Sequence, residues 1–546
     1  MAASCSASSQ IPAELNPLGL NTLLDLLHYA AETYADRPAY TSLGRSLSYR
    51  ELDALSAAFA CYLQQETDLQ PGDRIAIQLP NLIQYPIVLF GALRAGLVVV
   101  NTNPLYTPSE MLHQFNDSGA VALVILKGLA HQVESIYAQT RLRHLFVTQV
   151  GDLHGVIKRT LINGAVKYLK KMEPAFDLPQ ALPLRACLNR HNGQQPQPVA
   201  LQSSDTAVLQ YTGGTTGVAK GAVLSHANLV ANILQVENAL QTAARHWPDT
   251  VIAPLPLYHI YAFTCSQLVL LNGGHNVLIP NPRDLPGLIG VMDKYPATSF
   301  LGLNTLFVGL CNQPAFQNLD FSRLELTISG GMALTHKAAE QWLAVTGCRI
   351  VEGYGLSETS PVVTLNPPDA PLIGSIGKTL CCTDVKLLNH DGEPVVPGEA
   401  GMLCVKGPQV MSGYWQQHQA SDEVFTPDGY LITGDIANID DEGYLHLLDR
   451  AKDLIIVSGF NVYPSEVEDV VASHPDVIEC AVVGLPDECC GEVVRLCVVS
   501  ANPGLETADL QNWCRTHLAA YKVPKRVDFF SELPKTPVGK VLRRAL

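Results

Sequence analysis

The sequence predicts an α/β protein with a large N-terminal domain of layered α/β subdomains plus a β-rich subdomain, and a small C-terminal α+β domain. A chain of 546 residues is longer than one hydrophobic core usually supports, so at least two domains are expected. Helical and short apolar stretches alternate from about 22 to 350, which is typical of α/β layers. Between 375 and 450 the pattern changes to short β-runs separated by turn signals, and a smaller unit follows. The predicted domains are therefore 1–449 and 450–546.

The predicted elements of the large domain follow from hydrophobic periodicity. A helix is expected near 22–34, and Ser225 is a good N-cap for a second helix. The apolar run 85–100 contains Pro86, Arg94 and two glycines, so it predicts a buried helix followed by a core strand and not a membrane span. Strands are predicted at RIAIQL (74–79), ALVIL (122–126), TAVLQ (206–210), AVL (222–224) and VIAPLPL (251–257).

The C-terminal unit has its own order of elements. The strand DLIIVSG leads to Pro464 and to the capping-box pattern Ser465-x-x-Glu468, which predicts the start of a helix. Strands AVVGL and VRLCVVS follow, and a last helix is expected from about Thr507 to Ala519.

Composition limits the classes of partner and compartment. Apolar residues make up 47% of the chain and charged residues 16%, as in a compact globular protein. The net charge of −15 argues against a nucleic-acid partner, so anionic ligands must be bound by a few placed cations. The 14 cysteines show no paired CxxC spacing, which indicates reduced thiols, and the N-terminus lacks a signal pattern. Both observations favour a cytoplasmic protein.

The stretch YTGGTTGVAKG (211–221) predicts a phosphate-binding loop of an uncommon kind. The common phosphate loop has Gly-Lys before Ser or Thr and opens a helix, whereas Lys220 precedes Gly221 and a predicted strand. In a strand–loop–strand geometry the anion is held by backbone N–H groups, threonine hydroxyls and Lys220, and glycines allow a close approach. The alternative is a Gly/Thr-rich turn of a β-hairpin.

Three further pieces carry charged side chains near glycines. In EGYGLSET (352–359), Glu358 stands where a dinucleotide fingerprint needs its third glycine, so it is either a Mg²⁺ ligand or a solvated turn residue. Asp435, in TGD at the expected end of a strand, is a candidate acceptor for ribose hydroxyls, and Arg450 is a candidate donor to a second ribose or phosphate oxygen. Lys540, in LPKTPVGKVLRR (533–544), reads by itself as a surface lysine.

Taken in this order, these pieces resemble the adenylate-forming superfamily of acyl-CoA synthetases, firefly luciferase and peptide-synthetase adenylation domains. The resemblance covers nearly the whole chain and is strongest to bacterial long-chain fatty-acyl-CoA synthetases. It rests on several long motifs in a fixed order: NTNPLYTPSEM (101–111), LPLYHIYAF (255–263), ISGGMAL (328–334), VKGPQVMSGYW (405–415) and VSGFNVYPSEVEDV (457–470).

The resemblance implies that ATP and a fatty acid react to give acyl-AMP and pyrophosphate, with coenzyme A then taking the acyl group. It implies that Lys540 neutralises charge at the α-phosphate and that Glu358 and Thr212 help to hold Mg²⁺. The β- and γ-phosphates of ATP are assigned to Thr212, Gly213, Gly214, Thr215, Thr216, Gly217 and Lys220. Adenine and ribose are assigned to Gly330, Gly331, Met332, Tyr354, Gly355, Asp435 and Arg450. The acyl site is assigned to His259, with Phe263 at the mouth of its tunnel.

For the second half-reaction, the resemblance implies that the small domain is mobile. Its hinge maps to Lys452, and its movement withdraws Lys540 and brings Gly459 beside the channel for the pantetheine arm. A glycine suits a channel wall because a side chain would block it. The sequence departs from the motifs of the family, without losing a catalytic group, at Ala333, Ser357, Ile432 and Ala451.

Other functions are less consistent with these residues. A synthetase for aromatic or medium-chain acids is the main rival, because tunnel length is not readable from the sequence. An acyl-AMP ligase that loads carrier proteins is disfavoured, since Gly459 keeps the coenzyme A path open and no carrier domain follows Leu546. A protein that binds fatty acids without turnover is disfavoured by the presence of Lys540, Glu358 and Asp435 together.

The segment VIKRTLINGAVKYLKKM (156–172) is basic in an acidic protein and predicts an amphipathic helix. Its cations Arg159, Lys167, Lys170 and Lys171 are expected to point away from the apolar face, with Lys158 at the edge. That apolar face comprises Ile157, Leu161, Ala165, Tyr168, Leu169 and Met172. Such a helix predicts peripheral contact with an anionic membrane at its inner face, and the alternative is a linker helix that packs on the large domain. A homodimer is a further expectation for this chain.

Overall fold

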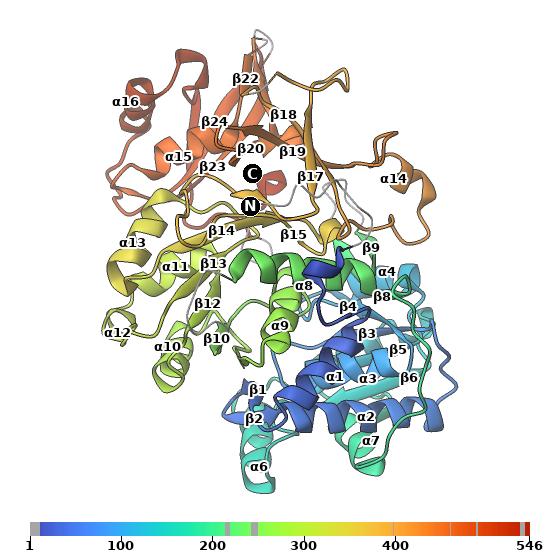
Figure 1. The fold of residues 1–546 in the computed structure, drawn as a ribbon. Helices are drawn as coiled ribbons and strands as arrows, with labels where there is room; N and C mark the ends of the chain where they lie inside the picture. The colour runs from blue at the N-terminus through green and yellow to red at the C-terminus, as the bar shows by residue number, and fades with distance from the viewer. Residues whose placement is uncertain are drawn as a thin grey trace.

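The computed structural model describes residues 11–212, 219–241, 249–396, 398–458, 460–487, 490–535 and 541–546 (Figure 1). The predicted fold class is confirmed, because layered α/β subdomains and a β-rich subdomain precede a smaller C-terminal unit. Some predicted site residues lie outside the described residues, namely Gly213, Gly214, Thr215, Thr216, Gly217, Gly459 and Lys540.

A seven-stranded sheet forms the first α/β subdomain, in the order β7-β6-β5-β3-β4-β8-β9. Its strands pair in parallel except β8 and β9, which are antiparallel and set Thr212 opposite Lys220. The predicted strands on either side of the glycine-rich loop are thus confirmed. The strands are β3 (Arg74–Gln78), β4 (Val98–Asn101), β5 (Ala122–Leu126), β6 (His144–Thr148), β7 (Ala181–Pro183), β8 (Thr206–Thr212) and β9 (Lys220–Ser225).

A nine-stranded sheet forms the second α/β subdomain, in the order β16-β15-β14-β13-β12-β10-β11-β1-β2. The strand predicted over 251–257 ends early, at Ala253, because Pro254 and Pro256 lack the N–H groups that a central strand needs. The strands are β1 (Pro38–Ser42), β2 (Arg45–Ser48), β10 (Thr250–Ala253), β11 (His275–Leu278), β12 (Ser299–Gly302), β13 (Leu326–Ser329), β14 (Ile350–Gly355), β15 (Val362–Leu365) and β16 (Lys378–Thr379).

Helices cover these two sheets, and three of them, α1, α3 and α8, confirm the sequence patterns. Every residue of α3 is buried, as the run 85–100 predicts, and β4 follows it. The Ser225 side chain accepts the N–H of Asn228 and caps α8. The helices of the large domain are α1 (Leu23–Thr33), α2 (Tyr49–Glu66), α3 (Gln84–Arg94), α4 (Pro108–Ser118), α5 (Ala130–Glu134), α6 (Val156–Gly164), α7 (Leu184–Arg190), α8 (His226–Leu240), α9 (Ile260–Leu271), α10 (Leu285–Lys294), α11 (Asn304–Cys311), α12 (Pro314–Gln317), α13 (His336–Thr346) and α14 (His418–Asp422).

The β-rich subdomain is a four-stranded antiparallel sheet that lies beside the C-terminal unit, above the α/β layers, in Figure 1. Its strands are β17 (Asp384–Leu388), β18 (Gly401–Lys406), β19 (Leu431–Ile439) and β20 (Leu445–Arg450). Asp435 lies inside β19 and not at a strand end, which corrects the sequence-based expectation. The antiparallel register sets Asp435 opposite Arg450, so the two candidate residues are cross-strand partners.

The small C-terminal unit has its own sheet and its own hydrophobic core. Its elements are β21 (Ile455–Val457), β22 (Phe460–Val462), α15 (Pro464–Ala472), β23 (Val477–Asp487), β24 (Gly491–Ser500), α16 (Thr507–His517) and β25 (Arg526–Phe529). The predicted capping box is wrong, because Tyr463 is the N-cap of α15 and Ser465 already belongs to the helix. The Glu468 carboxylate instead accepts the Val482 N–H at 2.7 Å and pairs with Arg543.

The segment predicted as a basic amphipathic helix forms α6 and then a π-helical turn, η4 (Ala165–Leu169). It is held by Asn163, which accepts the Gly151 N–H at 2.8 Å and donates to Asp152 at 3.2 Å. Its apolar side is not packed on the large domain, since the exposed fraction lies between 59 and 82% for Ile157, Leu161, Tyr168, Leu169 and Met172. One expectation is wrong, because Nη1 of Arg159 is buried and this side chain faces the protein.

Candidate active site

One cavity of about 2150 Å³ lies between the large domain and the small C-terminal unit. It is larger than the roughly 300–1,000 Å³ of a pocket for one small ligand, so it has room for several reactants. The cavity brings together most of the predicted site residues that the structure describes, which are Thr212, Lys220, His259, Gly330, Gly331, Met332, Tyr354, Gly355, Glu358, Asp435, Arg450 and Lys452.

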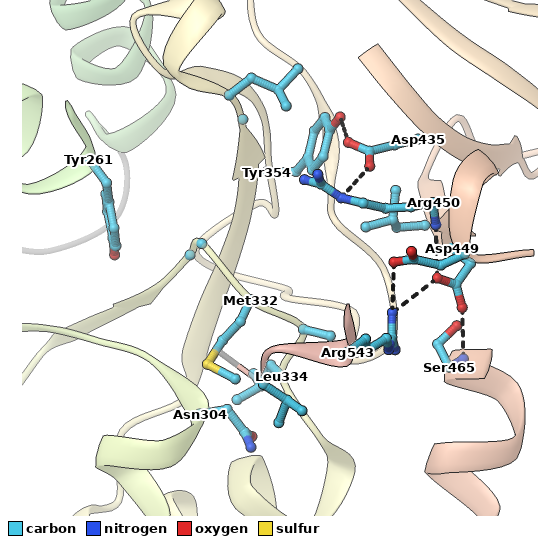
Figure 2. A pocket seen from close by; sticks show the side chains of 18 of the residues that line it. Tyr261, Asn304, Met332, Leu334, Tyr354, Asp435, Asp449, Arg450, Ser465 and Arg543 are labelled. Carbon is cyan, nitrogen blue, oxygen red and sulfur yellow. Dashed lines mark hydrogen bonds and ion pairs between the residues drawn. The ribbon is translucent and has the colours of Figure 1, made fainter. Parts of the chain in front are cut away.

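A chain of polar contacts runs along one side of the cavity (Figure 2). The Tyr354 hydroxyl at the end of β14 donates to Asp435 Oδ2 at 2.5 Å, and Arg450 Nε lies 3.2 Å from Asp435 Oδ1. Asp435 is only 2% exposed, so these donors stabilise a carboxylate that burial alone would disfavour. Burial and the adjacent Asp435 raise the pKa of Tyr354, which keeps its hydroxyl a donor. Each carboxylate oxygen still has acceptor capacity for a ligand hydroxyl.

A second polar group forms where the β8–β9 hairpin meets η5 (Ser357–Thr359). Glu358 accepts the hydroxyl of Tyr414 at 2.9 Å, and Lys220 Nζ lies 5.2 Å from the centre of the same ring. Burial raises the pKa of Glu358, although the Tyr414 hydrogen bond opposes that shift. Tyr414 therefore links two predicted residues. Tyr414 belongs to the motif VKGPQVMSGYW, whose sequence alone does not assign this tyrosine a role.

Two of the glycines that line the cavity lie where another residue would not fit or would be strained. A Cβ atom on Gly355 would lie 2.0 Å from the Pro361 carbonyl oxygen, so no other residue fits there without moving the backbone. Gly331 has φ of +81°, in the left-handed region that favours glycine, and Met332 follows it into the cavity lining.

An apolar wall of the cavity is built by α8, α9 and β15. It includes Val236, Cys265 and Val362. Asn232 of α8 ties β15 to this wall, because it accepts the Val362 N–H at 2.9 Å and donates to the Val362 carbonyl at 2.7 Å. His259 lines the cavity and caps α9 by accepting the Tyr261 N–H at 3.3 Å. Phe263, one turn further along α9, is fully buried in the core and is not among the lining residues.

Glu352, the first residue of the motif EGYGLSET, lines the cavity and was not predicted as a site residue from the sequence. It lies on β14 and accepts the Leu334 N–H at 3.1 Å. Burial raises its pKa from 4.5 to about 8, so the side chain carries a proton at neutral pH. Its charge state depends on tertiary burial, which no local sequence pattern reveals.

Replacing Glu352 by glutamine should make the protein more stable than the wild type at pH 8, and equally stable near pH 4.5. Between pH 4.5 and about 8 the unfolded chain releases a proton that folded Glu352 keeps, so the wild type loses stability as the pH rises. Thermal unfolding at both pH values measures the difference. Glu340→Gln, an exposed change on α13, is the control and should show no such pH dependence. A Glu352→Gln effect that is equal at both pH values would contradict the buried, protonated carboxyl.

The oxygen donors of the site fit a hard cation held largely by its substrate. Among the described residues, no group of three or more His, Cys, Asp or Glu side chains could hold a metal ion. Glu358 and Thr212 both line the cavity, and β8 contacts η5. One carboxylate and one hydroxyl suit Mg²⁺, which commonly takes its other ligands from phosphates and water.

Two family models match the chain. The model described as AMP-binding enzyme matches residues 27–415, and the model described as AMP-binding enzyme C-terminal domain matches residues 466–540. The chain is 49% identical over 540 residues to a long-chain-fatty-acid–CoA ligase of Salmonella typhimurium, which covers 98% of this chain and 96% of that protein. It is 34% identical over 503 residues to a feruloyl-CoA synthase of Amycolatopsis, with 92% of this chain and 93% of that protein covered.

The fold also matches solved structures. ATP-bound MatB from Rhodopseudomonas palustris superposes with a TM-score of 0.81 at 29% sequence identity, covering 95% of this chain and 98% of that chain. Because 95% of this chain is covered, the match includes both the large domain and the small C-terminal unit.

Proposed function

The chain belongs to the AMP-binding enzyme family, and on this premise we propose that it is a long-chain-fatty-acid–CoA ligase. It activates a long-chain fatty acid with ATP to acyl-AMP and then to the coenzyme A thioester, releasing AMP and pyrophosphate. The 49% identity to a long-chain-fatty-acid–CoA ligase over 98% of the chain is the observation that carries this conclusion. The apolar wall of α8, α9 and β15 lines the same cavity as Asp435, which fits a substrate with a charged head and an apolar tail.

The first half-reaction joins two anions, so positioning and charge neutralisation supply most of the catalysis. The fatty-acid carboxylate attacks the α-phosphorus of ATP, the bond to the β-phosphate oxygen breaks, and pyrophosphate leaves. We assign the leaving phosphates to Lys220 and to the loop from Thr212 to Gly217. We assign neutralisation at the α-phosphate to Lys540, and the next residue, Val541, lines the cavity.

The nucleoside is assigned to the polar side of the cavity. Asp435 accepts from the ribose hydroxyls, and Arg450 donates to a second oxygen while it keeps Asp435 charged. The adenine ring stacks on Tyr354 against the glycine-containing turns at Gly330, Gly331, Met332 and Gly355. Mg²⁺ is assigned to Glu358 and Thr212, where it neutralises phosphate charge when bound.

The acyl group is assigned to the apolar wall, with His259 near the carboxylate. Phe263 had been expected at the tunnel mouth, but its burial in the core gives no support to that role. In the second half-reaction the coenzyme A thiol attacks the acyl carbonyl and AMP leaves. We place the domain boundary at 449/450, with Lys452 as the hinge of a mobile domain 450–546 and Gly459 in the wall of the pantetheine path.

The substrate class is tested by measuring coenzyme A-dependent AMP formation over a panel of acids. Saturated acids of increasing length should give rising kcat/KM into the long-chain range, because each buried methylene contributes about 0.8 kcal/mol of binding. Ferulate and benzoate are included because the chain also resembles a feruloyl-CoA synthase. A preference for aromatic or medium-chain acids would contradict the long-chain assignment.

We further propose that the enzyme contacts an anionic membrane through the α6 surface, defined as the exposed side chains Leu43, Ile157, Leu161, Tyr168, Leu169 and Met172 with Lys158, Lys167, Lys170 and Lys171. The β1–β2 turn lies beside α6, because Arg45 Nε donates to the Leu153 carbonyl at 3.3 Å and a Cβ on Gly44 would lie 3.6 Å from Lys158 Nζ. In Figure 1, α6 projects from the end of the molecule opposite to the small domain, so a docked membrane leaves that domain unobstructed.

The exposed apolar side chains distinguish this surface from an ordinary basic patch. A linker helix would bury them, whereas an interfacial helix places them among the lipid chains and its lysines at the phosphates. Each lysine near an anionic leaflet contributes about 1 kcal/mol, and the net charge of the protein is screened beyond roughly 8 Å at physiological salt. Among the described residues, no helix has both the length and the apolar character of a membrane span, so contact would be peripheral.

The enzyme should therefore sediment with vesicles of phosphatidylcholine and phosphatidylglycerol at low salt, and release at high salt. Lys167→Glu, Lys170→Glu and Lys171→Glu together should abolish this binding, while acyl-CoA synthesis from dispersed fatty acid is retained. Lys525→Glu with Arg526→Glu in the small domain is the control and should bind like the wild type. If the wild type stays in the supernatant at low salt, the α6 surface does not bind membranes.

The cytoplasmic location and the homodimer remain predictions from the sequence. Analytical ultracentrifugation of the purified protein tests the homodimer.

A further inference from the structure

Asp449 joins the large domain to the small C-terminal unit just before the chain passes between them. It lies next to the end of β20, and its side chain is only 3% exposed. Oδ2 accepts the Ser465 N–H in the first turn of α15 at 2.8 Å, and Oδ1 lies 3.4 Å from Arg543 Nη1. The Ser465 hydroxyl also donates to the Leu448 carbonyl. Two neighbouring residues of β20 therefore bind the small domain.

Arg543 is fixed among three carboxylates. Its Nη2 lies 2.9 and 2.7 Å from the two oxygens of Glu468, and its Nη1 lies 3.3 Å from Asp453 and 3.4 Å from Asp449. Glu468 and Asp453 belong to the small domain, so Asp449 supplies the contact that crosses the boundary. If residue 449 is made neutral, Arg543 still pairs with Glu468 and Asp453. The substitution therefore leaves no buried cation without a partner.

The same stretch of β20 also reaches the nucleotide side of the cavity. Successive side chains of a strand point to opposite faces, and Arg450 pairs with Asp435 while Asp449 turns to Arg543 and Ser465 (Figure 2). The peptide between Asp449 and Arg450 thus connects the site assigned to ribose with the anchor of the C-terminal segment. Arg543 stands three residues after Lys540 in that segment.

We propose that Asp449 is a positioning residue for acyl-AMP formation, which rests on the function proposed above. Through Ser465 and Arg543 it holds the small domain in the orientation in which Val541, Leu542 and Arg543 line the cavity. The thioester-forming step attacks acyl-AMP already made and does not need that segment in place. Weakening the Asp449 contact therefore slows the first half-reaction and spares the second.

The test uses Asp449→Asn, which keeps an acceptor for the Ser465 N–H and removes the charge that faces Arg543. Fatty-acid-dependent exchange of pyrophosphate into ATP should fall about tenfold, the size of one charge-assisted contact. Thioester formation from supplied acyl-AMP and coenzyme A should change by no more than about twofold, within the usual scatter for a change away from the reacting atoms. Asp453→Asn is the matched control, because it removes a carboxylate from Arg543 without touching the boundary, and both half-reactions should be retained.

A double-mutant cycle with Arg543→Gln identifies the partner. If Asp449 acts through Arg543, the loss of exchange in the double variant should be smaller than the product of the two single losses. Equal losses in both half-reactions, or no loss in either, would overturn the proposal. Failure of the proposed function is distinguishable, since the wild type itself would then show no fatty-acid-dependent exchange.

Discussion

Lys540→Ala should lower the rate of acyl-AMP formation by about 10²- to 10³-fold, the usual effect of removing one group that stabilises developing charge. Thioester formation from supplied acyl-AMP should be largely retained. The carboxylate and the α-phosphate repel each other until a cation lies between them, whereas the thiol attacks a neutral carbonyl. Pyrophosphate exchange and the coenzyme A step, measured separately, give the two rates.

A matched control is available in the same C-terminal segment. Lys535 pairs with Glu479 at 2.9 Å on β23 and is not among the residues that line the cavity, so Lys535→Ala should leave both half-reactions within about twofold of the wild type. Equal losses in the two half-reactions of Lys540→Ala would show that the lysine has a different role.

Asp435→Ala should impair both half-reactions, because ATP and acyl-AMP carry the same ribose. The substitution removes the acceptor of a buried hydroxyl and the partner of Arg450, and losing one member of a buried ion pair costs about 3–5 kcal/mol. The Arg450 side chain is 43% exposed, so solvent screening lowers this cost in folding stability. The loss of charge-assisted hydrogen bonds to the ribose hydroxyls should lower kcat/KM by about 10²-fold. Steady-state kinetics with ATP and with supplied acyl-AMP measure it.

Asp435→Ala tests nucleotide binding in both half-reactions, whereas Lys540→Ala tests charge neutralisation in the first half-reaction alone. Asp435→Asn keeps the shape and an acceptor for Tyr354, and it should lose less activity than alanine. Asp440→Asn, in the exposed turn of the same hairpin, is the control, because its pair with His446 at 3.0 Å is a surface contact worth less than about 1 kcal/mol. Full retention of the coenzyme A step in Asp435→Ala would contradict the ribose assignment.

Local patterns predicted the elements whose determinants lie within a few residues. The strands β3 and β5 and the helix α8 with its cap at Ser225 follow from periodicity and capping, and the structure confirms them. The capping box at Ser465 failed for a tertiary reason, since the Glu468 carboxylate is drawn to Arg543, 75 residues away. Local spacing also placed Asp435 at a strand end, whereas pairing with β20 extends β19 through it.

The candidate site was predictable only through motifs in fixed order, because its contacts are long-range. Asp435 and Tyr354 are separated by 81 residues, and Tyr414 and Glu358 by 56. Glu352 and Asp449 were missed, since burial and the domain boundary give each its environment and neither leaves a local signature. For α6, hydrophobic periodicity predicted the helix correctly. The exposure of its apolar face and the inward direction of Arg159 are visible only in the folded structure.

The fate of the carboxylate oxygens shows whether the fatty acid is activated through acyl-AMP. A long-chain fatty acid labelled with ¹⁸O in both carboxylate oxygens is converted with ATP and coenzyme A, and the products are analysed by mass spectrometry. Attack on the α-phosphorus followed by thiol attack on the carbonyl leaves one labelled oxygen in AMP, one in the acyl-CoA and none in pyrophosphate. Unlabelled AMP, or label in phosphate together with ADP, would contradict activation through acyl-AMP.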